Sequence, residues 1–184
     1  MGVYNFVSSI MNCKKPTVFV VRGQAVGISF TIQSNADFIY CTPEATFTTP
    51  FMKSFQSPEG CSTLTFPEQL GPRLANEMLM LDKVLTAQEA HRAGFVNGIL
   101  PNSFLDSDFF DPNLVPAIPK LLATDYTTLV NCKEQMNLSK DLPLRNAVVK
   151  RENAALKAIY LSEEFPQKMM KYMMSVMNKN KPKM

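Results

Sequence analysis

The chain has 184 residues, a hydrophobic fraction of 46% and a net charge of +3, which suit one globular domain and argue against disorder. The charge is mild and no stretch alternates Arg and Lys with aromatic residues, which excludes a typical nucleic-acid-binding protein. No apolar run approaches the roughly 20 residues that cross a bilayer, so we expect no membrane span.

The first quarter of the chain has the alternation of short strands and helices that is typical of an α/β core. The expected elements are a helix end at 6–11, strands at 17–21, 38–41 and 45–48, and a short helix at 28–33. The strand at 17–21 is a continuous β-branched and aromatic run, which predicts burial on both faces. Gly23 and Gly27 punctuate the turn before the short helix.

Residues 49–60 carry little periodic pattern, so we expect a long irregular connection of the kind that often carries function. The elements expected after it are helices at 64–70, 73–81 and 86–94, and a strand at 95–100. Thr86 and Glu89 have the spacing of a capping box. Gly94 stands where a helix ends in a left-handed residue.

The composition changes at residues 102–119, which are rich in Asp, Pro and Phe. We interpret this segment as a linker or the base of a lid. Beyond it the pattern is helical, and the expected helices are 127–137, 144–161 and 164–178. We therefore divide the chain into a partial α/β core at 1–103 and a C-terminal helical region, for oligomerisation or as a lid, at 104–184.

The four cysteines are widely spaced and form no CxxC pair, and no nearby histidine completes a zinc site. We expect free thiols in a reducing compartment, and no metal site.

One carboxylate is set apart from the other charges of the sequence. Glu59 stands between Pro58 and Gly60, in a stretch whose only other charge is Lys53. A carboxyl in apolar surroundings has a raised pKa and can carry a proton near neutral pH. The glycine turn that opens the helix at 28–33 would offer free backbone N–H groups to a developing anion. Together these features suggest proton abstraction next to a carbonyl group.

Four blocks of this sequence resemble the crotonase (enoyl-CoA hydratase/isomerase) superfamily. VVRGQAVGIS at 20–29 is similar to its oxyanion turn, and the block at 85–96 to the helix and strand at the far edge of its core. ATFTTPF at 45–51 and QSPEGCS at 56–62 resemble the peroxisomal-type Δ3,Δ2-enoyl-CoA isomerase branch. The resemblance implies a crotonase-like α/β fold of ββα repeats, lacking its first strands and the first oxyanion donor, with C-terminal helices.

The resemblance also implies roles for single residues. Glu59 matches the single catalytic carboxylate of the isomerase branch, whereas the two glutamate positions of hydratases hold Thr31 and Phe51, which cannot activate a water. The N–H of Ile28, just after Gly27, matches an oxyanion donor. The oxyanion and substrate contacts that we expect are Ala25, Gly27, Ile28, Phe51 and Phe55.

The implied activity is the shift of a 3-enoyl-CoA double bond to the 2-enoyl position in fatty-acid β-oxidation. The partner is an acyl-CoA substrate, with no further cofactor. The alternatives are a non-catalytic or truncated relative that acts by acyl-CoA binding or subunit assembly, and a hydratase or thioesterase. The resemblance further implies a homo-oligomer, a trimer. Pro182-Lys183-Met184 loosely resembles a peroxisomal address, with the mitochondrion or cytoplasm as alternatives.

Several other residues have simpler interpretations. We expect His91 to be a surface or packing residue and Asp37 to be structural. The methionine stripe at 169–177 suits a core face or a subunit interface, with an acyl contact as the alternative. The phenylalanines are core residues on the simplest interpretation, with an acyl channel as the alternative; they are Phe47, Phe51, Phe55 and Phe66.

Overall fold

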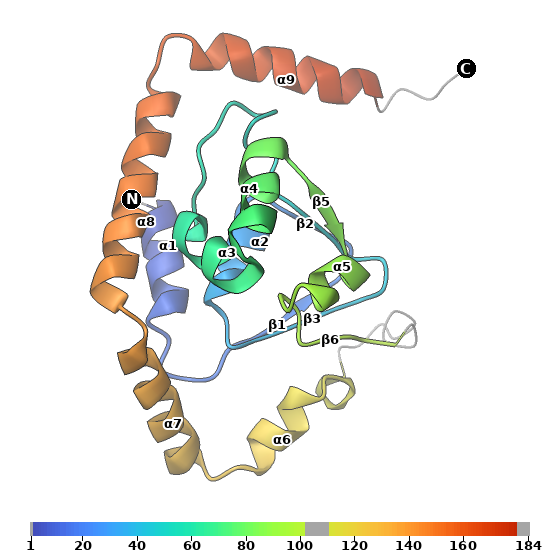
Figure 1. Cartoon of the computed structure of the whole chain (residues 1–184), viewed down its shortest axis with the longest axis vertical. Coiled ribbons are helices and arrows are strands. Elements are labelled where there is room, and N and C mark those ends of the chain that lie inside the picture. Colours follow the sequence, from blue (N-terminus) through green and yellow to red (C-terminus); the bar gives the residue numbers. More distant parts are fainter. Residues whose placement is uncertain (1, 102–110, 180–184) are drawn as a thin grey trace.

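A computed structural model describes residues 2–101 and 111–179 of the chain. Within these residues the strands form two small sheets at the centre of the fold (Figure 1). The parallel sheet has the order β1-β3-β6, with β1 at Val18–Val21, β3 at Phe38–Cys41 and β6 at Gly98–Ile99. The second sheet has the order β2-β4-β5, with β2 at Gln24–Val26, β4 at Thr46–Thr48 and β5 at Val84–Thr86. In it β2 is parallel and β5 antiparallel to β4.

Helices surround the sheets, and the C-terminal ones wrap the outside of the fold (Figure 1). The helices of the first part are α1 (Gly2–Met11), α2 (Ile28–Thr31), the 3-10 turn η1 (Ile32–Asn35), α3 (Ser62–Leu70), α4 (Pro72–Leu81) and α5 (Ala87–Arg92). Those of the second part are the 3-10 turn η3 (Pro112–Leu114), α6 (Ala117–Ala123), α7 (Tyr126–Ser139), α8 (Leu142–Tyr160) and α9 (Phe165–Lys179). None of the helices in the described ranges combines the length and apolarity that a bilayer crossing needs.

An aromatic cluster holds the main core together. The rings of Phe30 and Phe66 lie 4.8 Å apart, and Phe95 meets Phe30 edge-on at 5.0 Å. Phe47 of β4 joins the same cluster, 5.4 Å from Phe30. Such tilted and edge-on pairs add to the stabilisation that burial of the rings provides. The cluster therefore fixes α2 and α3 against β4, which sets the position of the loop between them.

A second apolar cluster docks α8 onto the first half of the chain. Val148 and Val149 of α8 pack with Val7 of α1, Ile32 of η1 and Cys61 at the start of α3. Figure 1 shows α8 running beside α1. The expected C-terminal helix at 144–161 is thus confirmed, and it covers the region where the irregular loop enters α3.

The structure departs from the expected elements in several places. The strand at 17–21 is present as β1, but Val18, Phe19 and Val20 are only partly buried, so the expected burial on both faces is wrong. Among the described strands β1 pairs only with β3 and lies at the edge of its sheet. The strand expected at 95–100 is only Gly98–Ile99, since Phe95 and Val96 turn into the core instead. Of the expected linker or lid base at 102–119, residues 102–110 lie outside the described residues, and the rest holds η3 and the start of α6.

The division of the chain at 103/104 also falls outside the described residues and stays a prediction. The four cysteines, which are Cys13, Cys41, Cys61 and Cys132, have free thiols as expected.

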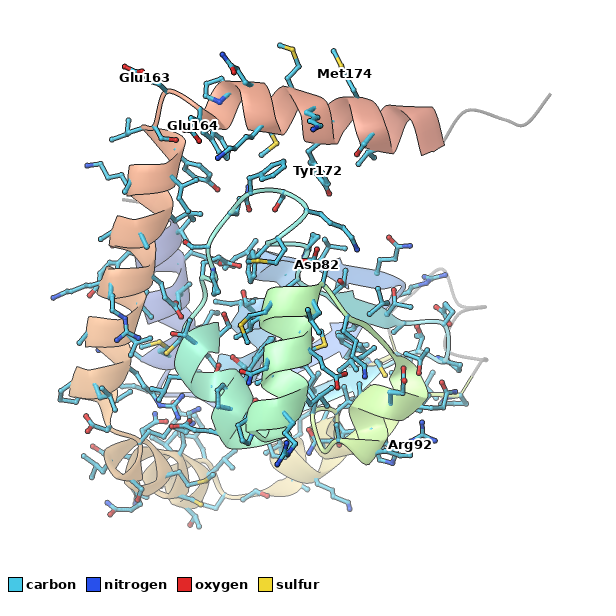
Figure 2. All side chains as sticks on the ribbon, turned by 45° about the horizontal axis from the view of Figure 1, so that its top comes forward. Asp82, Arg92, Glu163, Glu164, Tyr172 and Met174 are labelled. Carbon is cyan, nitrogen blue, oxygen red and sulfur yellow. The ribbon has the colours of Figure 1, made fainter. Side chains whose placement is uncertain are left out.

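Three methionines of the α9 stripe face away from the core. Met170, Met173 and Met174 are 59%, 53% and 55% exposed, so they are not the core face that the sequence suggested as one possibility. Figure 2 shows Met174 projecting from the outer side of α9, while Tyr172 points toward the rest of the fold. The interpretations as an interface or an acyl contact stay predictions.

Candidate active site

Glu59 lies in the irregular loop between β4 and α3, and its carboxyl is buried. The residue is 7% exposed. Its Oε1 accepts a hydrogen bond of 2.9 Å from the hydroxyl of Thr31, the last residue of α2. Its Oε2 is buried and has no hydrogen-bond partner. One oxygen therefore fixes the orientation of the carboxyl, while the other is free to exchange a proton.

The loop before Glu59 is held in place by a carboxylate at the end of α4. Asp82 accepts hydrogen bonds of 3.0 Å from the backbone N–H groups of Met52 and Lys53. Asp82 is itself buried and lies just below the loop (Figure 2). Backbone donors in a loop without secondary structure need such partners. The anchor explains how a stretch with no periodic pattern has a defined path to Glu59.

Close packing of backbone against side chain positions the carboxyl from its other side. Gly60 has a φ of +77°, and a Cβ added there would lie 2.3 Å from the hydroxyl oxygen of Thr31. Only glycine satisfies both the left-handed backbone and this close approach. Thr31 is thus pressed between Gly60 and the Glu59 carboxyl to which it donates.

A second carboxylate, Glu152 of α8, binds the start of α3. Its Oε2 accepts from the N–H of Cys61 at 2.7 Å, and its Oε1 accepts from the N–H and the hydroxyl of Thr63 at 3.0 and 2.6 Å. The first N–H groups of a helix have no partner within the helix, and a negative charge is favourable there. Since both oxygens of Glu152 are engaged, it anchors the loop rather than exchanging protons.

The surroundings of Glu59 shift its protonation toward neutral pH. Burial raises the pKa of Glu59 to about 7, although the hydrogen bond from Thr31 lowers it, and the negative charge of Glu152 raises it further. Burial also raises the pKa of Tyr160 at the end of α8, and the charge of Glu59 adds to that shift. A carboxyl with a pKa near 7 can both accept and return a proton under neutral conditions.

The glycine turn stands at the opposite end of α2 from Thr31. Gly27 is the residue before the helix and makes no side-chain cap, while its own N–H donates to the carbonyl of Thr48 at 3.0 Å. Ile28 begins the helix, so its N–H has no acceptor within the helix. The two ends are three residues apart, or about 4.5 Å along the axis. The short helix α2 therefore carries the expected oxyanion donor, the N–H of Ile28, at one end and Thr31, which binds the expected base Glu59, at the other.

The remaining predicted contacts lie in different surroundings. Ala25 of β2 and Phe51 are buried in the main core. Phe55 is 39% exposed and has a φ of +56°, so the simplest interpretation of it as a core residue is wrong. Phe47 and Phe66 are core residues, as the simplest interpretation had it. The roles of Ala25, Phe51 and Phe55 in substrate binding stay predictions.

Sequence reasoning missed Glu152 and Tyr160, although a signal was present. The buried residues Val148, Glu152 and Leu156 recur every four positions along α8, and Tyr160 continues this spacing. Such a spacing marks one face of a helix. A glutamate within an otherwise apolar helix face is expected to be buried, and a buried carboxylate needs hydrogen-bond donors as partners.

Asp37 and His91 have the surroundings expected of a structural residue and of a surface residue, respectively. Asp37 is buried beside Lys133 of α7. His91 is exposed, and its Nδ1 lies 3.2 Å from the carbonyl of Val96.

Comparison with known protein families gives a match to nearly the whole chain. A family described as Enoyl-CoA hydratase/isomerase matches residues 1–182. Enoyl-CoA delta isomerase 2 of Rattus norvegicus is 38% identical over 165 residues, which are 86% of this chain and 39% of that protein. Enoyl-CoA delta isomerase 3, peroxisomal, of Mus musculus is 44% identical over 103 residues, 56% of this chain and 32% of that protein.

A relative with a different name matches at similar length. Testis-specific chromodomain protein Y 2 of Homo sapiens is 34% identical over 170 residues, which are 92% of this chain and 30% of that protein. The chain thus spans less than two fifths of each of these three relatives.

Solved structures show the same fold. An enoyl-CoA hydratase/isomerase from Pseudoalteromonas atlantica T6c superposes with a TM-score of 0.83 at 24% identity, covering 92% of this chain and 66% of that one. An enoyl-CoA hydratase from Mycobacterium avium subsp. paratuberculosis K-10 has a TM-score of 0.82 at 22% identity, covering 94% and 68%. The fold class expected from the sequence is therefore confirmed.

Proposed function

Because this chain belongs to the enoyl-CoA hydratase/isomerase family, we propose that it is a Δ3,Δ2-enoyl-CoA isomerase with Glu59 as its base and acid. The observation that carries the proposal is the Glu59 carboxyl, which is buried, oriented by Thr31 through one oxygen and unpartnered at the other. The curated relatives named as enoyl-CoA delta isomerases support the same activity.

In the proposed reaction one proton moves and no water is used. The free oxygen of the Glu59 carboxylate removes a proton from C2 of the 3-enoyl thioester, and the electron pair of that bond passes into the thioester carbonyl. The resulting dienolate takes the same proton back from Glu59 at C4. The double bond then lies between C2 and C3, and Glu59 is again ionised. A pKa of about 7 suits both halves of this transfer.

The negative charge on the thioester oxygen needs hydrogen-bond donors. We assign the N–H of Ile28 as one of them, because it starts α2 and has no acceptor within that helix. Loss of one such donor typically costs about 2.7–4 kcal/mol, or 10²–10³ in rate.

The surroundings of the two hydratase positions favour an isomerase over a hydratase. Thr31 donates its hydroxyl to Glu59, and Phe51 is buried in the main core. Glu152, the other carboxylate near Glu59, has both oxygens bound to the start of α3. No second carboxyl oxygen in this part of the described structure is therefore free to activate a water.

We extend the proposal to the acyl-CoA substrate, to a trimer and to the peroxisome. The name of the mouse relative supports the compartment. The C-terminal residues that loosely resemble a peroxisomal address lie outside the described ones. The alternative function is acyl-CoA binding or subunit assembly without turnover.

The test follows the conversion of 3-enoyl-CoA to 2-enoyl-CoA by the wild-type chain and by Glu59→Gln. We expect the substitution to lower the rate by at least about 10²-fold, as for loss of a positioned acid–base group. Glu163→Gln is the matched control, because Glu163 is an exposed glutamate at the corner between α8 and α9 (Figure 2).

Equal turnover by wild type and Glu59→Gln would end the assignment of Glu59. Binding of a CoA thioester by the wild-type chain without any turnover would favour the alternative function.

A further inference from the structure

A small cavity of about 90 Å³ lies where the C-terminal helices meet the core. Its walls come from the end of α1, from η1, from Gln69 of α3 and from the corner between α7 and α8. This volume is several times the roughly 10–15 Å³ that one water needs, and well below the roughly 300–1,000 Å³ of a site for a drug-sized ligand. The cavity therefore suits a small ion rather than an organic molecule with a chain.

Asn35 of η1 presents an unsatisfied acceptor in the wall of this cavity. The residue is 7% exposed, and its Oδ1 is buried without a hydrogen-bond partner. Its Nδ2 donates to the carbonyl of Gly60 at 3.0 Å, which holds the amide in place. A buried acceptor that lacks a donor is costly. A ligand of this cavity should therefore bring a hydrogen-bond donor.

Two cationic side chains line the same cavity. They belong to Lys140 and Arg145, and none of the eight lining residues is acidic. Arg145 is bound to Glu68 outside the cavity lining. Lys140 lies 3.8 Å from Asp37, but Asp37 also binds Lys133. Within the described ranges these two lysines share one carboxylate, so one of their two positive charges is not neutralised.

The protonation of Lys140 agrees with this excess of positive charge. Burial lowers the pKa of Lys140, the charge of Lys133 lowers it further, and the negative charge of Asp37 acts in the opposite direction. An anion next to the ammonium group would favour its charged form. The cavity thus combines a place for negative charge with an acceptor that needs a donor, whereas a metal cation would be repelled by both basic side chains.

We propose that this cavity binds a small oxyanion that keeps a hydroxyl hydrogen, with its charge at Lys140 and Arg145 and its hydroxyl donating to Oδ1 of Asn35. Inorganic phosphate and bicarbonate have this chemistry at neutral pH, whereas sulfate has acceptors only. Because Asn35 also binds the carbonyl of Gly60, next to Glu59, the bound anion would hold η1 against the loop of the candidate active site. The binding itself does not depend on the proposed function.

The experiment compares phosphate, bicarbonate and sulfate by calorimetry, in a degassed buffer that contains none of them and at constant ionic strength. We expect phosphate or bicarbonate to bind the wild type at least about tenfold more tightly than sulfate, because sulfate would leave the buried Oδ1 of Asn35 without a donor. The anion that binds more tightly of these two is the one that the cavity takes.

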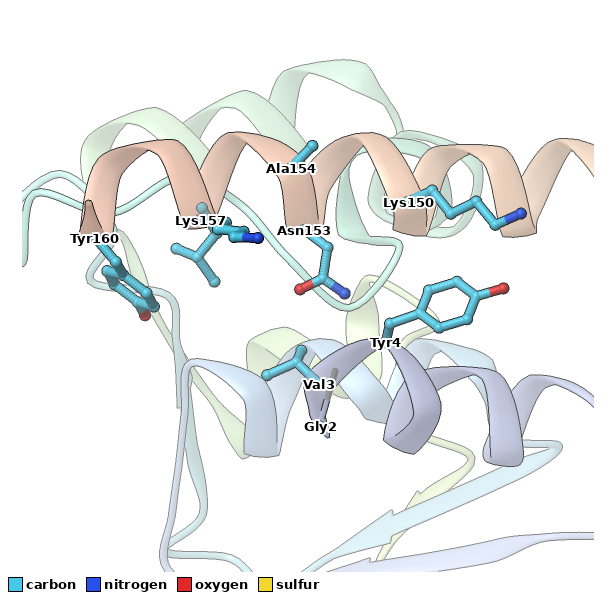
Figure 3. A pocket seen from close by; sticks show the side chains of 9 residues that line it. Gly2, Val3, Tyr4, Lys150, Asn153, Ala154, Lys157 and Tyr160 are labelled. Atoms are coloured by element: carbon cyan, nitrogen blue, oxygen red, sulfur yellow. The ribbon is translucent and has the colours of Figure 1, made fainter. Parts of the chain in front are cut away.

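A substitution then places the binding in this cavity. Lys140→Met should weaken the preferred anion by at least about tenfold, as for the loss of one charged hydrogen-bond donor. Lys150→Met is the matched control and should bind like the wild type, because Lys150 is an exposed lysine of α8 that lines a separate cavity against α1 (Figure 3).

The inference is overturned if the wild type binds neither phosphate nor bicarbonate, if sulfate binds as tightly as they do, or if Lys140→Met leaves their affinities unchanged. The comparison of the three anions needs only the wild type, so it decides even where Lys140→Met is unstable. A wild-type chain that shows the expected anion binding but does not isomerise 3-enoyl-CoA would reject the proposed function and leave this inference standing.

Discussion

The protonation of Glu59 links the chemistry of this residue to the stability of the fold. Burial, opposed by the Thr31 hydrogen bond and aided by the charge of Glu152, raises its pKa from the ordinary value of 4.5 to about 7. The folded chain therefore holds a proton that the unfolded chain has lost at intermediate pH. This contribution to stability is complete below about pH 4.5, and it is lost as the pH rises through about 7.

Substitution of Glu59 by Gln should remove this pH dependence. Between about pH 5 and pH 8, the free energy of unfolding of the wild-type chain should fall by roughly 2–3 kcal/mol more than that of Glu59→Gln. Urea unfolding at the two pH values measures the difference, and Glu163→Gln should behave like the wild type. If the unfolding free energies of the wild type and Glu59→Gln fell equally between these two pH values, the Glu59 carboxyl would not be titrating in this range.

The close approach of Gly60 to Thr31 gives a second prediction at this scale. Gly60 and Gly94 share a φ of +77°, but only at Gly60 would a Cβ meet other atoms, at 2.3 Å from the Thr31 hydroxyl oxygen. Gly94→Ala should cost about 1–2 kcal/mol for the left-handed backbone. Gly60→Ala should cost about 1–3 kcal/mol more, because it also overpacks the site. Equal losses of unfolding free energy for the two variants would contradict the contact with Thr31.

Part of this site could be predicted from residues alone. The isolation of Glu59 among apolar neighbours indicated a raised pKa, which burial in the structure explains. In the sequence, Thr31 was informative only because it occupies a hydratase glutamate position without being a glutamate. Its hydrogen bond to Glu59 could not be predicted. That bond joins residues 28 positions apart, so it depends on how α2 meets the loop.

At the scale of elements, Glu152 couples α8 to the loop that carries Glu59. Its carboxylate accepts three hydrogen bonds from Cys61 and Thr63, two to four positions after Glu59. Glu152→Gln keeps the shape of the side chain but removes the charge and replaces one acceptor with a donor. We expect a loss of about 1–3 kcal/mol in unfolding free energy, measured in urea.

The same substitution should also move the titration of Glu59. Because the negative charge of Glu152 raises the pKa of Glu59, its removal should lower that pKa. The pH at which turnover, or the stability difference described above, reaches half its change should then be lower than in the wild type. A purely structural role would leave that midpoint unchanged. Glu134→Gln, at an exposed position of α7, is the control.

The elements that the sequence predicted well are those with a pattern of their own. β3 has the predicted bounds, and the capping box of Thr86 and Glu89 is present at α5. β2 and β5 are three residues each, too short for a period, and they exist because both pair with β4. The helix α6 was hidden by its prolines, although Pro119 stands in its first turn, where proline is tolerated.

At the scale of the molecule, contacts distant in sequence hold the C-terminal helices against the α/β core. Lys133 of α7 donates to Asp37, which lies 96 positions earlier in the sequence. Glu152 of α8 accepts from the N–H of Cys61, which lies 91 positions earlier. Composition and periodicity indicated these helices but not the surface on which each one docks. The docking depends on buried charged side chains, and their partners, the Asp37 carboxylate for Lys133 and the backbone N–H of Cys61 for Glu152, are not encoded locally.

The buried pair of Lys133 and Asp37 gives the last prediction. The Lys133 ammonium lies 2.6 Å from Oδ2 of Asp37, and the side chains are 5% and 8% exposed. Asp37 also accepts from the N–H and the hydroxyl of Thr17 at 2.8 and 3.0 Å. Burial acts to raise the pKa of Asp37, but the hydrogen bonds from Lys133 and Thr17 and the charge of Lys133 outweigh it and lower that pKa.

Lys133→Met would leave the Asp37 carboxylate buried without its main partner, at a cost of about 3–5 kcal/mol in unfolding free energy at neutral pH. Lys140→Met is the matched control, because Lys140 lies 3.8 Å from Asp37 and is 30% exposed, so its loss should cost about 1 kcal/mol or less. The lowered pKa stabilises the wild type above the ordinary Asp value of 3.8, and this contribution is lost in acid. The difference in unfolding free energy between the wild type and Lys133→Met should therefore become smaller as the pH falls below about 4. Urea unfolding at several pH values measures it. A gap that stays constant, or a Lys140→Met variant as unstable as Lys133→Met, would mean that this ion pair does not hold α7 to the core.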